Sequence, residues 1–184
     1  RLRATLGAAV REQMIADGFS DRQAQSKILC TLAQLRAMNG EFDEARALYR
    51  RGRGLLRELG HGVNAASTGI DLLGVELLAG DLATAEREVM ADYEFLGRAG
   101  ETYVLSSIAA LLSRVMRDQG RIDEAMVLSK AAEEASAADD VESQALWRSI
   151  RAPIVARSGN LIEAESLARS AVDLSRQTDA RPLQ

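Results

Sequence analysis

Several residue types are scarce in this 184-residue sequence, and each scarcity excludes a class of protein. A single cysteine, Cys30, rules out an intramolecular disulfide and fits a reducing compartment, for which we expect the cytoplasm. One cysteine and one histidine, without metal-ligand spacing or a phosphate-binding loop, predict neither an enzyme nor a bound cofactor. No apolar run approaches the roughly 18 residues that a membrane span requires, so we expect no membrane partner.

Aromatic residues make up only 4% of the sequence, whereas alanine and leucine abound, which is the composition of closely packed helices. Few aromatics are available to stack on bases, and the net charge is −4. Both features argue against direct binding of nucleic acid. The charge is also uneven, because residues 1–60 carry 11 basic and 7 acidic side chains whereas residues 61–184 carry 12 and 20.

A short phrase that begins with glycine and ends with alanine recurs along the chain. Its four copies occupy residues 40–45, 80–85, 120–125 and 159–164, a period near 40 residues. The first copy reads Gly-Glu-Phe-Asp-Glu-Ala and the third Gly-Arg-Ile-Asp-Glu-Ala. Apolar stripes at three-to-four spacing flank every copy and predict two helices joined at the glycine. Such a period is typical of a repeat architecture.

The geometry of two joined helices accounts for the individual positions of the phrase. The glycine ends the first helix because it adopts positive φ without a steric penalty from Cβ. The aspartate three residues later, Asp43 or Asp123, is expected to cap the second helix. The final alanine is expected to be buried where the paired helices cross; these alanines are Ala45, Ala85, Ala125 and Ala164.

These phrases resemble the inter-helix signature of tetratricopeptide repeats over about four repeats. The resemblance implies an all-α fold, a right-handed α-α superhelix of helix-turn-helix repeats (a tetratricopeptide-like solenoid). We expect one domain over residues 1–184, with a lone helix at 1–18 and repeats at 20–60, 62–98, 101–138 and 139–177. The family's usual period is about 34 residues, so each helix here must be nearly a turn longer.

Two stretches, 77–86 and 140–152, are similar to the C-terminal helical region of large bacterial regulators. Those regulators carry a cyclase-like or DNA-binding domain and an AAA-type ATPase module upstream. The sequence does not begin with methionine, and residues 178–184 look like the lead into another helix. We therefore expect this chain to be a piece of a longer protein.

Tetratricopeptide arrays bind partners mostly on the concave face, which the first helices line. Carrying the family's groove positions onto this chain, by register from each glycine, gives a predicted partner-binding set. The set comprises Lys27, Cys30, Gln34, Met38, Ser67, Ile70, Gly74, Leu77, Ser107, Ala110, Arg114, Arg117, Leu146, Ser149, Pro153 and Arg157.

The later arginines of this set are predicted to cluster in space and to hold a carboxylate or phosphate of a partner. An alternative is that they neutralise nearby acidic residues, namely Asp118, Asp139 and Glu142. A second basic surface is predicted on the second helix of the first repeat, from Arg46, Arg50, Arg53 and Arg57. It either holds an acidic partner or pairs with acids of the next helix, such as Glu86 and Glu88.

These observations favour a non-enzymatic scaffold within a larger bacterial signalling or transcriptional regulator. Its concave face would bind a peptide, a partner protein or another domain of the same chain. Two alternatives stay open: a small-ligand sensor domain of a signalling ATPase, and a structural spacer or oligomerisation arm. The sequence alone does not separate these three.

Overall fold

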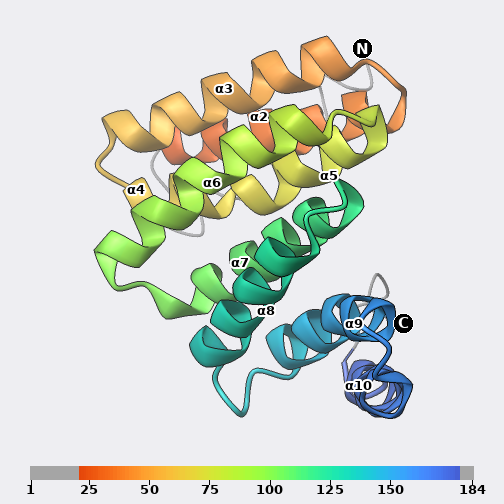
Figure 1. Cartoon of the computed structure of the whole chain (residues 1–184). Helices are drawn as coiled ribbons and strands as arrows, with labels where there is room; N and C mark the ends of the chain where they lie inside the picture. Colours follow the sequence, from red (N-terminus) through yellow and green to blue (C-terminus); the bar gives the residue numbers. More distant parts are fainter. Residues whose placement is uncertain (1–20, 179–184) are drawn as a thin grey trace. The chain divides into compact units, whose positions relative to one another are not determined.

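The computed structural model describes residues 21–178, and every regular element in that range is an α-helix (Figure 1). The helices are α2 (Asp21–Met38), α3 (Phe42–Glu58), α4 (Gly62–Ser67), α5 (Gly69–Ala79), α6 (Leu82–Ala99), α7 (Thr102–Asp118), α8 (Ile122–Ala135), α9 (Val141–Arg157) and α10 (Leu161–Ser175). The prediction of an all-α helical solenoid is confirmed, while the helix expected at 1–18 lies outside the described residues. Contacts divide the chain into unit 1, residues 1–81, and unit 2, residues 82–184. The single domain over residues 1–184 stays a prediction.

Each glycine of the recurring phrase occupies the turn between two helices, as predicted. Gly40, Gly80, Gly120 and Gly159 all have positive φ, between 73° and 91°. At the first turn, the Gly40 amide donates to the Ala37 carbonyl at 2.9 Å, and the following amide reaches back to Arg36 at 2.9 Å. These bonds satisfy carbonyl groups that the helix end would otherwise leave open.

The predicted capping role of Asp43 and Asp123 is wrong. The second helices begin two residues after the glycine, so both aspartates lie inside the first turn and not at the cap. The residues at the cap positions, Glu41 and Arg121, make no side-chain cap bond. The two carboxylates still lie where the helix dipole favours negative charge.

In unit 1, α2 and α3 approach each other closely at Gly52. A Cβ at this position would lie 3.0 Å from Cys30 Sγ and 3.1 Å from the Ser26 carbonyl oxygen. The Ser26 hydroxyl donates to the Gly52 carbonyl at 2.9 Å across the same contact. A side chain at this position would push its neighbours apart by a few tenths of an ångström, and protein interiors have little spare volume for such a shift.

The first helix of the second repeat is divided into α4 and α5 at Thr68. The Thr68 hydroxyl donates to the Ala65 carbonyl at 2.7 Å, and the Ser67 hydroxyl donates to the Asn64 carbonyl at 2.8 Å. Hydroxyl groups that take helix carbonyls in this way compete with the backbone ladder. Gly69, which follows, adds backbone freedom at the same place. Asn64, Ser67 and Thr68 at this division are exposed or partly exposed.

In unit 2, α7 packs on α8 and α9 packs on α10, and α9 also contacts both helices of the preceding pair. Small residues allow the close crossings: Ser113 of α7 donates to the Ala125 carbonyl of α8 at 2.7 Å. The prediction that the phrase alanines are buried is confirmed, with exposed fractions of 0% for Ala45, Ala85 and Ala125 and 8% for Ala164. The tightest crossings in both units therefore involve residues of minimal size.

Candidate partner-binding surfaces

Unit 1 contains a polar groove of about 460 Å³ between α2 and the α4–α5 segment. Among the predicted groove positions, Lys27, Cys30 and Gln34 of α2 line it together with Ser67 of α4. The complete lining, which defines the polar groove, is Gln23, Ser26, Lys27, Cys30, Thr31, Gln34, Leu56, Asn64, Ser67, Thr68 and Asp71. The remaining positions predicted in unit 1, Met38, Ile70, Gly74 and Leu77, are not among its lining residues.

The polar groove carries two opposite charges, those of Lys27 and Asp71. Burial raises the pKa of Asp71, and the Lys27 ammonium and the Gln34 amide oppose that rise. Lys27 is therefore close enough to act on the carboxylate electrostatically, although no ion pair joins the two within the described part of unit 1. The sequence register identified Lys27 but missed Asp71, which the α4–α5 segment brings to the same groove.

Beneath the groove lies a polar group without a partner. The Tyr49 side chain of α3 is fully buried, and its hydroxyl makes no hydrogen bond with any described residue. Burial, followed by the charges of Asp71 and Cys30, raises the pKa of Tyr49. The nearby Gln34 amide opposes this rise in pKa, although it is not placed to form a hydrogen bond with the hydroxyl. The Tyr49 hydroxyl is thus within electrostatic reach of Asp71 and Cys30, two residues that line the polar groove.

Cys30 is buried, with an exposed fraction of 6%. Burial, with a smaller effect from Asp71, raises the pKa of Cys30 to about 11. The thiol is consequently protonated at neutral pH and is a poor nucleophile. Cys30 contributes a neutral, weakly polar surface to the groove floor.

Unit 2 contains an apolar groove of about 610 Å³ between α7, α9 and α10. Its lining, which defines the apolar groove, is Leu111, Arg114, Ala145, Leu146, Ser149, Ile150, Ala152, Pro153, Ala156, Ala164, Ala168, Ala171 and Val172. Arg114, Leu146, Ser149 and Pro153 were predicted by register, whereas Ser107, Ala110, Arg117 and Arg157 do not line it. Six of its 13 lining residues are alanines of α9 and α10.

Two of the later arginines, Arg114 and Arg117, are engaged with an acidic neighbour on their own helix. Asp118 lies 3.7 Å from Arg114 Nε and 2.7 Å from Arg117 Nη2. Asp118, one of the acids predicted to neutralise the arginines, therefore neutralises both Arg114 and Arg117. Arg157 is exposed at the end of α9 and forms no ion pair with the described residues of the chain. The expected cluster of three arginines around one ligand is therefore reduced to a pair that shares one aspartate.

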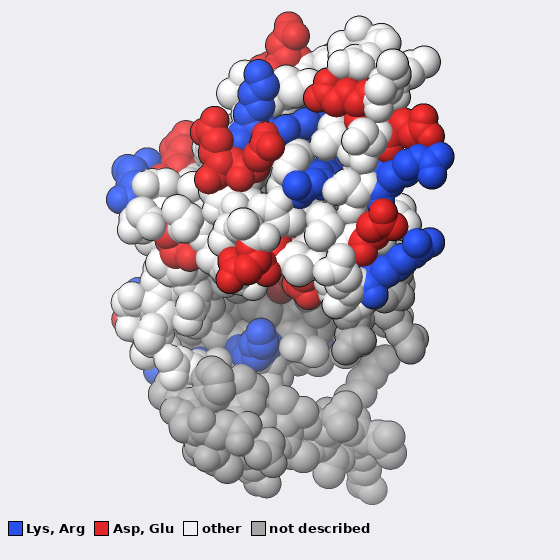
Figure 2. All heavy atoms as spheres, turned by 90° about the horizontal axis from the view of Figure 1, so that it is seen from below, with Lys and Arg blue, Asp and Glu red and all other residues white. Residues whose placement is uncertain are grey.

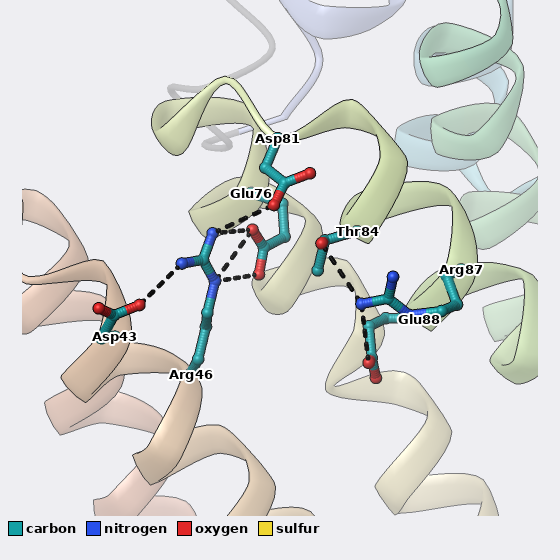
Figure 3. Close-up of polar contacts among 7 residues, drawn as sticks. All are labelled: Asp43, Arg46, Glu76, Asp81, Thr84, Arg87 and Glu88. Atoms are coloured by element: carbon teal, nitrogen blue, oxygen red, sulfur yellow. Dashed lines mark hydrogen bonds and ion pairs between the residues drawn. The ribbon is translucent and has the colours of Figure 1, made fainter.

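The predicted basic stripe of α3 begins with a buried ion pair. Figure 3 shows Arg46 between Asp43 of its own helix and Glu76 and Asp81. Arg46 donates to Glu76 through Nε at 2.9 Å and through Nη2 at 2.6 Å, a two-point contact with a carboxylate that is 1% exposed. Hydrogen bonding to Glu76 raises the pKa of Arg46, although burial opposes it.

The acids that neutralise this stripe are not those predicted. Glu86 instead accepts from Arg121 at 2.7 Å, and Glu88 lies 3.9 Å from Arg87. Further along α3, Arg53 is only 4% exposed, whereas Arg50 and Arg57 are exposed. The four arginines therefore do not form a continuous basic surface. On the face of the molecule in Figure 2, acidic and basic side chains are likewise interspersed.

No group of three or more histidine, cysteine, aspartate and glutamate side chains among the described residues is arranged to hold a metal ion. None of the helices between residues 21 and 178 combines the length and apolar character needed to cross a membrane.

Comparison with known proteins supports the repeat. Residues 28–51, which run from the middle of α2 through the Gly40 turn into α3, match a family model described as tetratricopeptide repeat. No curated protein matches the chain. The crystal structure of BtubC (BKLC) from P. vanneervenii superposes with a TM-score of 0.67 over 88% of this chain and 67% of that chain, at 16% sequence identity. At this identity the likeness shows the fold alone.

The chain is thus an all-α protein that contains a tetratricopeptide-like helical repeat. Repeats of this class generally mediate protein–protein interaction through the extended surface that stacked units provide.

Proposed function

We propose that this chain is a non-enzymatic interaction scaffold that binds a peptide, a partner protein or another domain of its own protein on the face of the first helices. The observation that supports it most is the polar groove of unit 1. Lys27, Gln34 and Ser67, which were selected by register alone, come from successive repeats and share this groove. Shared, concave polar surfaces built from neighbouring repeats suit extended partners.

The proposal extends to the setting of the scaffold. The likeness of stretches 77–86 and 140–152 to bacterial regulators supports a role inside a larger signalling or transcriptional regulator in the cytoplasm. Both signs of charge are interspersed on the surface in Figure 2, which favours protein over nucleic acid as the direct partner. Oligomerisation of the regulator is compatible with this role.

A small-ligand sensor is the second candidate function. The volume of the polar groove, about 460 Å³, falls within the range of roughly 300–1,000 Å³ that is usual for small-molecule sites. Its opposite charges, Lys27 and Asp71, are the convergent polar groups that such sites require.

Three double variants, each tested against the same peptide array, distinguish the candidate surfaces. Lys27→Ala with Gln34→Ala removes two polar side chains of the polar groove. Arg114→Ala with Arg117→Ala removes the paired arginines of unit 2. Arg50→Ala with Arg57→Ala removes two exposed arginines of the α3 stripe.

We expect only the first variant to bind the peptides more weakly. Its affinity should fall by about tenfold or more, which corresponds to the loss of one or two charge-assisted hydrogen bonds. Circular dichroism serves as the check that each variant is folded. Affinities that are equal in the wild type and all three variants, or an array on which no peptide binds, would overturn the proposed function.

A further inference from the structure

We propose that the polar groove of unit 1 binds a small zwitterion, a molecule with a primary ammonium and a carboxylate, which pair with Asp71 and Lys27 respectively. This inference uses the same groove as the proposed function and names the chemical group that the groove recognises. Free amino acids and short peptides both carry this pair of charges.

Lys27 and Asp71 line the same concave surface, and neither forms an ion pair with another described residue. Several other charged residues of unit 1 are engaged with partners; Arg46 is held by Glu76, and Arg36 is held by Glu41 and Glu44. Arg50 and Arg57 are exposed on α3 and do not line the groove. The groove therefore brings together a cation and a carboxylate that are both open to pairing with a ligand.

The chemistry of the remaining lining selects a molecule with both charges. Gln34, Asn64 and Thr31 are neutral polar side chains, so Lys27 and Asp71 are the charged members of the lining. A simple cation would be attracted by Asp71 and repelled by Lys27, and a simple anion would experience the reverse. A zwitterion that spans the groove gains from both residues at once.

Burial makes the ammonium contact the stronger half of this recognition. Asp71 is partly withdrawn from water, which raises its pKa because the charged carboxylate loses hydration. A ligand ammonium restores that lost stabilisation when it pairs with the carboxylate. Arg53 and Lys27 supply the nearby positive charges, both of which act on Cys30 at the groove floor.

Tyr49 is the positioning residue for Asp71. Its hydroxyl is fully buried, so a ligand in the groove does not touch it, yet Asp71 is close enough to raise its pKa. A buried hydroxyl without a partner is costly. Tyr49 packs in one core cluster with Cys30, which lines the groove. Rotation of the Asp71 carboxylate to the Tyr49 hydroxyl would satisfy the hydroxyl and fix the carboxylate for the ligand.

The first experiment is a calorimetric titration of the purified chain with single L-amino acids and with the dipeptide dialanine. N-acetylalanine and alanine amide, which each retain one charge, serve as controls. We expect at least one zwitterion to bind and its single-charge analogue to bind about tenfold or more weakly. Preference for the amino acid or for the dipeptide identifies the source of the ligand.

Matched variants then assign the contacts. Asp71→Asn and Lys27→Gln should each weaken the zwitterion by about 10- to 100-fold, the effect of a lost hydrogen bond to a charged group. Asp43→Asn and Lys130→Gln are controls of the same chemistry that do not line the groove, and they should bind as the wild type does.

Tyr49→Phe separates positioning from a purely structural role. Removal of an unpaired buried hydroxyl should leave the melting temperature unchanged or higher, while affinity for the zwitterion falls about two- to tenfold. A variant that binds like the wild type would show that Tyr49 has no part in recognition.

The outcomes distinguish this inference from the proposed function. If no zwitterion binds up to millimolar concentration, or if Asp71→Asn binds normally, the inference is overturned. If array peptides still bind through Lys27 in that case, the scaffold function stands. If zwitterions bind as expected and no array peptide does, the inference stands and the scaffold function is replaced by that of a sensor.

Discussion

The two units place different chemistry in equivalent repeat positions. In unit 1 the groove is polar, with Lys27 and Asp71 left to interact with a ligand. In unit 2 the groove is lined chiefly by alanine and other apolar side chains, and its arginine, Arg114, faces an aspartate on its own helix at 3.7 Å. The repeat therefore supplies the concave geometry, while single side chains decide what each groove can bind.

The ion pairs of the two units differ in how far they are buried. Unit 1 joins α3 to α5 through Arg46 and a Glu76 carboxylate that is almost wholly removed from water. Unit 2 joins α6 to the turn before α8 through Arg121 and Glu86, whose side chains are 38% and 27% exposed. Buried pairs are costly to break because the surviving charge stays unsolvated, whereas solvated pairs contribute little.

The largest expected effect follows from this contrast. Arg46→Met should destabilise the chain by about 3–5 kcal/mol, since it leaves the Glu76 charge buried without its main partner. Arg121→Met in unit 2, the matched control, should cost much less. Urea denaturation measures both changes in the free energy of unfolding.

A double variant sharpens this test. Combining Arg46→Met with Glu76→Met should recover most of the lost stability, because no buried charge remains. Equal losses for Arg46→Met and Arg121→Met would contradict the difference between the two ion pairs.

A smaller effect is expected at the helix crossings, where the units should behave alike. Ala45→Leu in unit 1 and Ala125→Leu in unit 2 each overpack a crossing at which alanine is 0% exposed. Each should cost about 1–3 kcal/mol. Thermal melting is the measurement, and Ala47→Leu, on the exposed side of α3, is the control. An unchanged melting temperature for either crossing variant would show that its crossing accommodates a larger side chain.

The smallest effect concerns Asp71, because only the groove of unit 1 is lined by a carboxylate. Burial raises the folded-state pKa of Asp71, so the folded protein retains this proton more readily than the unfolded chain. Without ligand, the contribution of Asp71 to stability should fall as pH rises. The fall begins at the ordinary pKa of aspartate, about 3.9, and is complete above the raised pKa of the folded state.

Asp71→Asn should remove that slope and be more stable than the wild type above this window. Cys30 and Tyr49, whose pKa values are raised, remain protonated throughout the acid range and do not interfere. Melting curves across the acid range, with Asp43→Asn as the control, measure the difference. A wild type and an Asp71→Asn variant with parallel pH profiles would rule out an energetic cost of this buried charge.

The sequence by itself determined the repeat, because its signals are local. A glycine at positive φ and flanking stripes at helical spacing depend on residues close together in the chain, and all four turns form where they predict. The burial of the four phrase alanines can be predicted in the same way, since each lies five residues after its turn glycine. Lys27 and Gln34 were identified for this reason: their register on α2 follows from Gly40.

The tertiary structure alone decided which distant residues meet. Glu76 and not Glu86 pairs with Arg46, because α5 packs against α3 within unit 1. Asp71 lies in the polar groove because α5 packs against α2 within unit 1. Burial of Tyr49 and Arg53 likewise depends on packing between helices. Such pairings and burials arise from contacts across many residues, which the spacing along one helix does not encode.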